Sequence, residues 1–167
     1  MNKKYFFLLF VLIIAGFLTS CNRQSPKMQF VLVPKSISNP YWIQVEKGMK
    51  EAGKKYDINV KFMAPIQAAD VTAQVNIIES LIAKGVSGIA VSANDPDGVT
   101  GVIDKAIAAG IPVITFDSDA PNSSRLAYIG TDNYKAGREA GKQFVKSLGP
   151  KGEYAIMTGG LGALNLN

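Results

Sequence analysis

The sequence predicts an α/β fold: a doubly wound parallel sheet with helices on both of its faces. From Met28 onward, short apolar runs of strand length alternate with amphipathic stretches of helix length, and the connections between them are short. Such alternation is typical of a parallel sheet covered by helices. The strand candidates are continuous apolar runs rich in β-branched residues, as expected for strands buried on both faces.

The elements follow one another in regular order. We expect strands at residues 28–33, 58–63, 88–92, 111–116, 126–129 and 154–158. The first helix places Trp42, Val45, Met49 and Ala52 on one face. Asp70 offers an N-cap for the second helix, which Gly85 stops. A turn at 94–98 precedes the third helix, which Gly110 ends, and the fourth helix spans 134–148.

Residues 1–21 predict a lipoprotein signal peptide. A basic start is followed by an apolar stretch from Tyr5 to Leu18 that is short for a membrane span. The ending Leu-Thr-Ser-Cys resembles a bacterial lipobox, in which Cys21 is lipid-modified and becomes the mature N-terminus. An ordinary signal peptide with an incidental cysteine is the alternative. Residues 22–27 are polar and contain a proline, so we interpret them as a tether.

Composition excludes several kinds of chemistry. The chain has no histidine and a single cysteine, Cys21, which removes Ser-His-Asp and Cys-His catalysis and most zinc or iron sites. We therefore expect no enzymatic activity, no cofactor and no metal. Loss of Lys3 and Lys4 with the signal lowers the formal charge from +5 to about +3. The remaining charges are scattered, which argues against nucleic-acid binding.

Polar residues gather where the predicted strands end, which is where ligands bind in such sheets. Asp117 directly follows a strand, at a place where a ligand hydroxyl could use an acid; Asp95 and Asp97 are turn or cap residues. The loop at 34–41 carries a cation, an amide and two aromatic rings: Lys35, Asn39, Tyr41 and, beside it, Trp42. Aromatic faces beside charged hydrogen-bonding groups suit a sugar ring.

The sequence leaves open which of the two adjacent aromatic residues meets the ligand. Trp42 shares a helical face with Val45 and Met49, so burial in the core competes with a place at the site. Tyr41 points about 100° away from Trp42 on a helix. One of the two is therefore expected to face the crevice.

Four stretches resemble the periplasmic binding proteins of the ribose/galactose type (type I), the sugar receptors of ABC importers. They are Ser38–Trp42, Leu81–Ile89, Ala109–Asp117 and Tyr128–Asn133. The resemblance runs from Met28 to the end of the chain. It implies two lobes that close on a monosaccharide, with residues 28–130 as the N-terminal lobe and 131–167 as the hinge crossing and the start of an incomplete second lobe.

The resemblance also implies roles for individual residues. Asn39 and Asp117 bind hydroxyls and Tyr41 and Trp42 stack on the sugar ring. The remaining expected ligand contacts are Lys35, Asp119, Asn165 and Asn167. Ribose receptors typically carry a small hydroxyl residue at the position of Lys35 and an arginine at that of Ser118. These departures favour another ligand, such as glucose, rhamnose or autoinducer-2.

The expected function is capture of a monosaccharide by an exported, lipid-anchored monomer that delivers it to an ABC permease in the membrane. A sensing receptor subunit for a sugar or autoinducer-2 is the alternative. The effector domain of a LacI-type regulator shares this fold but would need a DNA-binding segment before Met28, where the signal and lipobox stand.

Overall fold

The computed structural model describes residues 27–155, and a five-stranded sheet forms its centre. The strands are β1 (Gln29–Val33), β2 (Asn59–Phe62), β3 (Gly88–Val91), β4 (Val113–Phe116) and β5 (Tyr128–Ile129). They lie in the order β2-β1-β3-β4-β5, and all four neighbouring strand pairs are parallel. The direction of winding reverses between β1 and β3, which is the topological switch point of the sheet.

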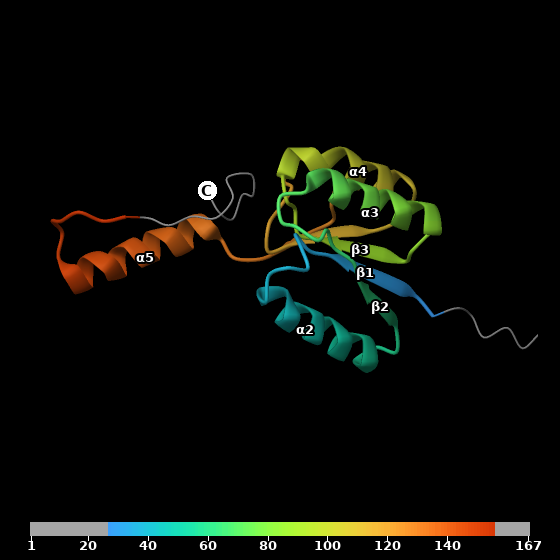
Figure 1. Cartoon of the computed structure of the whole chain (residues 1–167), viewed down its shortest axis with the longest axis horizontal. Coiled ribbons are helices and arrows are strands. Elements are labelled where there is room, and N and C mark those ends of the chain that lie inside the picture. The colour runs from blue at the N-terminus through green and yellow to red at the C-terminus, as the bar shows by residue number, and fades with distance from the viewer. Residues whose placement is uncertain (1–26, 156–167) are drawn as a thin grey trace, which may run out of the picture.

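Helices cover both faces of the sheet, as the sequence predicts. They are α2 (Tyr41–Lys55), α3 (Val71–Lys84), α4 (Pro96–Ala108) and α5 (Asn133–Leu148). Figure 1 shows α3 and α4 together on one face and α2 on the other. The remaining helix, α5, stands apart from the sheet and buries none of its residues.

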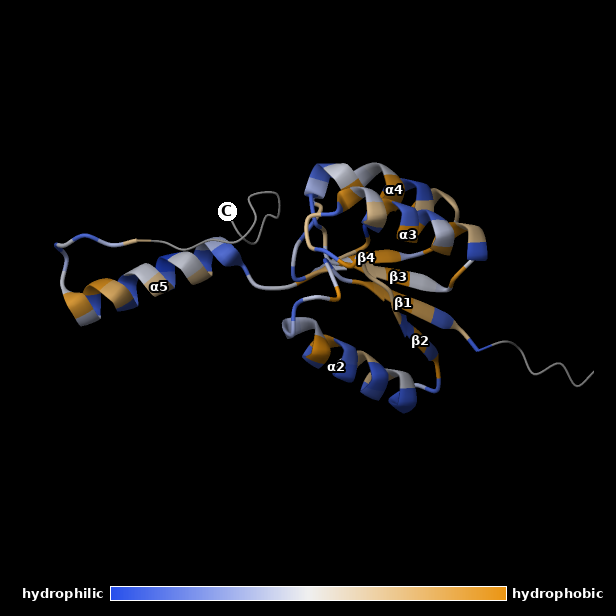
Figure 2. Cartoon of the chain, in the orientation of Figure 1, coloured by the Kyte–Doolittle hydropathy of each residue, from blue (hydrophilic) through white to orange (hydrophobic). Residues whose placement is uncertain are grey.

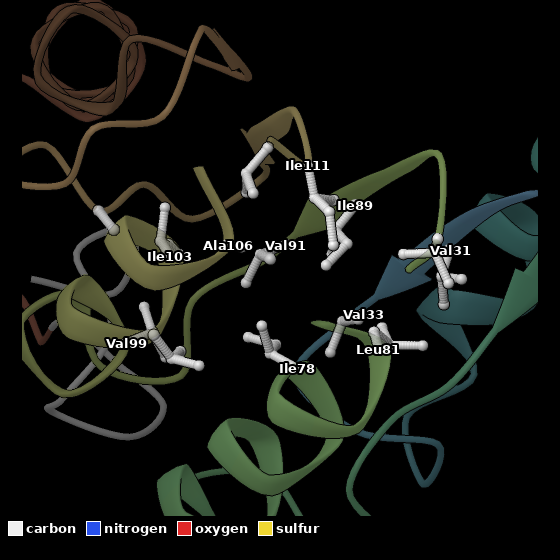
Figure 3. Packing of buried hydrophobic residues seen from close by; sticks show 14 of the residues in the cluster. Val31, Val33, Ile78, Leu81, Ile89, Val91, Val99, Ile103, Ala106 and Ile111 are labelled. Carbon is white, nitrogen blue, oxygen red and sulfur yellow. The ribbon is translucent and has the colours of Figure 1, made fainter. Parts of the chain in front are cut away.

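The core lies between the sheet and the pair α3 and α4. Alternate strand residues such as Val31, Val33 and Val91 are fully buried there, because successive side chains of a strand point to opposite faces. Figure 3 shows Val33 and Val91 in one cluster with Ile78 of α3 and Ile103 of α4, and Val31 at the end of the cluster near Leu81. In Figure 2 the apolar colour follows β1 and β4, whereas much of α2 is polar.

Helix α2 covers the opposite face through few residues. Trp42, Met49 and Gly53 are its buried positions. A Cβ atom at Gly53 would lie 2.7 Å from Val60 Cγ2, so the glycine allows α2 to approach β2 closely. Residues with larger side chains at this position would push the helix away from the sheet.

The predicted helix ends are confirmed. The Asp70 carboxylate accepts a hydrogen bond from Ala73 N at 2.9 Å, which satisfies one of the unpaired amides of the first turn of α3. Gly85 ends this helix with φ of 62°, a left-handed conformation that favours glycine. Asp95 caps α4 in the same way through Gly98 N at 2.7 Å, so the helix begins inside the turn predicted at 94–98.

The strand predicted at 154–158 is not found in its described part. Tyr154 and Ala155 belong to no strand, and Tyr154 is 74% exposed. Helix α5 carries the chain away from the sheet, so this apolar segment has no strand edge beside it with which to pair. The other three residues of the prediction lie outside the described part of the chain.

Within residues 27–155 no helix is both long and apolar enough to cross a bilayer. The predicted signal segment precedes these residues, and its structure is outside the described range.

Truncation of the core should destabilise the fold strongly. Ile103→Ala removes a fully buried side chain of α4, and we expect it to lower the free energy of unfolding by about 2–4 kcal/mol. Urea unfolding followed by circular dichroism measures the change. Ile43→Ala is the matched control, because Ile43 is 62% exposed; its effect should stay within about 0.5 kcal/mol. Equal losses in the two variants would contradict this description of the core.

Candidate ligand-binding site

The site centres on the carboxylate of Asp117, at the carboxyl end of β4. Its Oδ2 accepts a hydrogen bond from Ser92 Oγ at 2.8 Å and lies 3.7 Å from Lys35 Nζ. Ser92 directly follows β3 and Lys35 lies two residues beyond the end of β1, so three neighbouring strands bring their ends to one point. The side chains of Lys35 and Asp117 are 11% and 20% exposed, which leaves both a narrow access to solvent.

The electrostatics of this cluster follow from partial burial. Burial lowers the pKa of Lys35, and the carboxylate of Asp117 partly opposes this effect. Burial raises the pKa of Tyr41, and the negative charge of Asp117 raises it further. The 3.7 Å separation of Lys35 Nζ and Asp117 Oδ2 places an ammonium donor and a carboxylate acceptor side by side. Hydrogen bonds from such groups are stronger than those between neutral groups.

The main chain holds Asp117 in an unusual conformation. Its φ is 59°, in the left-handed region that residues with a side chain seldom occupy. Two hydrogen bonds fix this turn: Asp117 N donates to Ile129 O at 3.1 Å, and Tyr128 Oη donates to Asp117 O at 2.9 Å. Strain that is held in this way is often found at functional sites.

The structure separates the two adjacent aromatic residues. Trp42 is 5% exposed, and its ring packs edge-on against Phe116, with the centroids 6.1 Å apart. Tyr41 is 55% exposed and lies edge-on to Trp42, with the centroids 4.9 Å apart. Trp42 thus belongs to the packing beneath α2, and Tyr41 is the ring at the surface.

Asn39 shapes the start of α2. Its Oδ1 accepts a hydrogen bond from Tyr41 N at 2.9 Å, an arrangement typical of asparagine in turns. The side chain is exposed, and this turn does not use its Nδ2 donor. Asn39 therefore fixes the position of Tyr41 and keeps a donor for a second role.

Asp119 lies in a network of its own and not beside Lys35. Its carboxylate accepts hydrogen bonds from Arg125 Nη2 at 2.6 Å, from Thr115 Oγ1 at 2.6 Å and from Ala120 N at 2.8 Å. Burial alone would raise the pKa of Asp119, but these hydrogen bonds and the charge of Arg125 outweigh it and lower the pKa. In the structure Asp119 therefore stabilises the loop after β4 by pairing with Arg125.

Two residues that the sequence analysis did not predict, Gln74 and Asn94, hold the loops that carry Lys35 and Ser92. Gln74 of α3 is fully buried, and its Nε2 donates to Ser92 O at 2.9 Å and to Pro34 O at 3.2 Å. Its Oε1 accepts from Asn94 N at 3.0 Å, and Asn94 Nδ2 donates to Lys35 O at 3.0 Å. A buried glutamine with all its groups paired makes a rigid tie between loops. The sequence pattern that could have predicted the burial of Gln74 is its position among the apolar residues on one face of α3.

Three predicted residues, Cys21, Asn165 and Asn167, lie outside the described residues 27–155. Among the described residues no group of acidic, histidine or cysteine side chains is arranged to hold a metal ion.

Residues 30–167 match the family model described as "Periplasmic binding protein domain". The chain belongs to this family. The match covers the described sheet from the second residue of β1 onward, together with the loops that form the site.

Similar proteins agree with this assignment. The ribose import binding protein RbsB of Bacillus subtilis is 26% identical over 87% of this chain and 51% of its own. A solute-binding protein from Burkholderia graminis, solved with D-arabinose, is 39% identical, with a TM-score of 0.81 over 86% of this chain and 49% of its own. GanP, a glucose-galactose binding protein from Geobacillus stearothermophilus, is 38% identical, with a TM-score of 0.78 over 84% and 50%. The chain thus spans about half the length of the relatives it matches.

Loss of the Asp119 carboxylate should destabilise the protein in a pH-dependent way. We expect Asp119→Asn to lower the free energy of unfolding at pH 7 by about 1–3 kcal/mol, because Arg125 is left without its charged partner. A lowered folded-state pKa stabilises the protein above the unfolded pKa of about 3.9. This contribution is lost as the pH falls through the folded value, so the variant should depend less on pH in this acidic range.

Urea unfolding between pH 7 and pH 3 tests this expectation. Asp57→Asn serves as the control, since the Asp57 carboxylate is 82% exposed beside Lys27 and exposed pairs contribute less than about 1 kcal/mol. Parallel acid profiles for the wild type and the Asp119 variant would show that the network is not structural.

Proposed function

We propose that this chain forms one wall of the monosaccharide site of a receptor that serves an ABC import permease. The main observation is that Ser92 and Lys35, which follow the two strands of the switch point, both contact the Asp117 carboxylate. The exposed ring of Tyr41 is near enough for the charge of Asp117 to raise its pKa. Ligands bind at the switch point in open α/β sheets. Relatives named for ribose and for glucose-galactose, and one solved in complex with D-arabinose, support the class of ligand.

The proposed chemistry uses the paired charges for adjacent hydroxyls. Asp117 accepts a hydrogen bond from one sugar hydroxyl, and Lys35 donates to its neighbour. Asn39 supplies a further donor through Nδ2, and Tyr41 offers its face to the apolar side of the ring. Trp42 acts from beneath, by fixing the ring of Tyr41. A sugar with the wrong hydroxyl geometry would leave one of these polar groups without a partner, which is the basis of selectivity.

The site is proposed to close by a hinge. We assign residues 28–130 to the first lobe and 131–167 to the crossing and the beginning of a second lobe, to which Asn165 and Asn167 would belong. The position of α5, beyond the carboxyl edge of the sheet, supports a chain that crosses at this point (Figure 1). Closure of two lobes around a ligand is a hinge motion.

Lys35 is the proposed determinant of which sugar is bound. Of the two departures from ribose receptors, Ser118 is fully buried, whereas Lys35 reaches the Asp117 carboxylate. Lys35 therefore favours a ligand other than ribose, with glucose, rhamnose and autoinducer-2 as the candidates.

We further propose that the protein is exported and held at the membrane by lipid on Cys21. The order of basic, apolar and small residues before Cys21 supports this. The relatives, as periplasmic binding proteins, support export itself.

Removal of the Asp117 charge should weaken sugar binding. We expect Asp117→Asn to reduce affinity at least tenfold, or about 1.5–3 kcal/mol, because a charge-assisted acceptor is lost. Amide chemical shifts of the 167-residue chain, titrated with glucose, rhamnose, ribose and autoinducer-2, detect even millimolar binding.

The matched control for this titration is Asp97→Asn. Asp97 is an exposed acid in the first turn of α4, where Asn122 is its hydrogen-bond partner at 3.4 Å. It should bind like the wild type. If the wild type and Asp117→Asn show the same saturable chemical-shift changes with the same affinity, Asp117 does not contact the ligand.

Loss of the Cys21 thiol should abolish anchoring. We expect Cys21→Ala to carry no acyl groups and to leave the membrane fraction, measured by mass spectrometry and fractionation of the producing bacterium. Ser20→Ala is the control, since it keeps the thiol and a small neighbour. Persistent acylation or anchoring of the Cys21 variant would contradict the lipobox prediction.

A further inference from the structure

A basic and partly apolar surface lies at the amino edge of the sheet, on the side away from Asp117. We call it the amino-edge patch and define it by Lys27, Met28, Lys54, Lys55, Tyr56 and Lys84. All six residues are exposed. Lys54 and Lys55 end α2, Lys84 ends α3, and Lys27 and Met28 lead into β1.

Hydrogen bonds bring these segments together. Asn59 N donates to Met28 O at 2.9 Å, which places the loop after α2 beside the first described residues. Lys27 forms an ion pair with Asp57 in the same loop. From the other face of the sheet, Ser87 N donates to Gln29 O at 2.8 Å, which brings the end of α3 to this edge. Figure 1 shows the start of β1, the end of α2 and the end of α3 on the same side.

The chemical character of the patch goes beyond ordinary helix capping. Lysines at helix ends are favoured by the helix dipole, which accounts for Lys54, Lys55 and Lys84. The dipole does not account for Tyr56 and Met28, which are 64% and 57% exposed beside them. Lys55 Nζ lies 5.2 Å from the centre of the Tyr56 ring. Tyrosine is enriched at the membrane–water interface, and lysine is enriched on protein surfaces that lie on anionic lipid. The patch combines both residue types.

The charge of the patch is positive. The patch has four lysines, and two acidic residues lie close to it. Asp57 is already paired with Lys27, and Glu51 lies one turn back on α2. Polybasic surfaces are attracted to anionic lipid headgroups, and each lysine near such a surface strengthens binding roughly fivefold.

We propose that the amino-edge patch rests on the headgroups of anionic lipids. The proposal depends on the anchoring of Cys21 proposed above. Six residue steps separate Cys21 from Lys27 and reach at most about 20 Å, so an anchored chain holds this edge close to the bilayer. The patch then turns the carboxyl edge, with Asp117 and Lys35, away from the lipid and toward dissolved ligand.

A headgroup-proximity measurement on the acylated chain in vesicles tests the proposal. Because Cys21 is the natural cysteine and is acylated, Tyr56→Cys provides a unique thiol for a nitroxide label. We expect strong relaxation by nickel chelated to lipid headgroups in vesicles containing phosphatidylglycerol. The relaxation should fall severalfold in vesicles of pure phosphatidylcholine, or when about 0.5 M salt is added, because salt screens the attraction.

Controls separate the patch from the anchor. A label at Asn122→Cys, an exposed position near the carboxyl edge, should show weak relaxation in all vesicles. Lys54→Glu with Lys55→Glu should reduce the signal at residue 56 severalfold, whereas Lys142→Glu with Lys146→Glu on α5 should leave it unchanged. Circular dichroism verifies folding, and Lys84→Cys replaces Tyr56→Cys if that variant does not fold.

The possible failures are distinguishable. A chain whose mass shows no acyl groups would overturn the anchoring proposal and the patch proposal with it. An acylated chain that floats with the vesicles but gives equal signals at residues 56 and 122 would overturn the patch proposal alone. An unchanged signal after charge reversal would do the same.

Discussion

The convergence of three parallel strand ends is the constraint on which the candidate site depends. β1, β3 and β4 are direct neighbours and run in the same direction, so the residues that follow them meet at one edge of the sheet. Lys35, Ser92 and Asp117 are separated by long stretches of sequence, yet each lies only one or two residues beyond its strand, and both Lys35 and Ser92 contact Asp117. An antiparallel arrangement would send one of these ends to the opposite edge.

A charged pair at a sheet edge keeps its geometry only if the loops that carry it are rigid. Two networks supply this rigidity. Gln74 and Asn94 tie the loops after β1 and β3 through main-chain groups. Asp119 and Arg125 brace the loop after β4, where Asp117 adopts its left-handed conformation. The bracing groups are fully or largely withdrawn from solvent, where hydrogen bonds are strong and unpaired polar groups are costly. Preorganisation of this kind lowers the entropy lost when a ligand is bound.

Apolar periodicity was sufficient to predict the fold class and the position of each described strand, and the capping preferences of aspartate and glycine predicted the helix ends at Asp70 and Gly85. Periodicity could not assign Trp42, because a ring on the face of Val45 and Met49 suits both a buried position and a binding site. In the structure Trp42 is buried beneath α2 and packs against Phe116. Nor could periodicity separate Asp117 from Asp119, two residues apart in one turn. That difference depends on Arg125, whose approach to Asp119 is a property of the folded loop. Gln74 was missed because burial of a polar side chain is visible only when its partners are in place.

The described lobe also has opposite charges at its two edges, and helix capping alone produces much of this polarity. Asp70 and Asp95 cap helix starts at the carboxyl edge, while lysines occupy helix ends at the amino edge. Because each helix runs antiparallel to its strands, α3 and α4 each place an acidic cap at the carboxyl edge, and α2 and α3 each end in lysine at the amino edge. The candidate site lies at the carboxyl edge, beside these acidic groups. The amino edge gains a positive surface where the chain enters β1, so the same preference of charged residues for helix ends shapes both edges of the sheet.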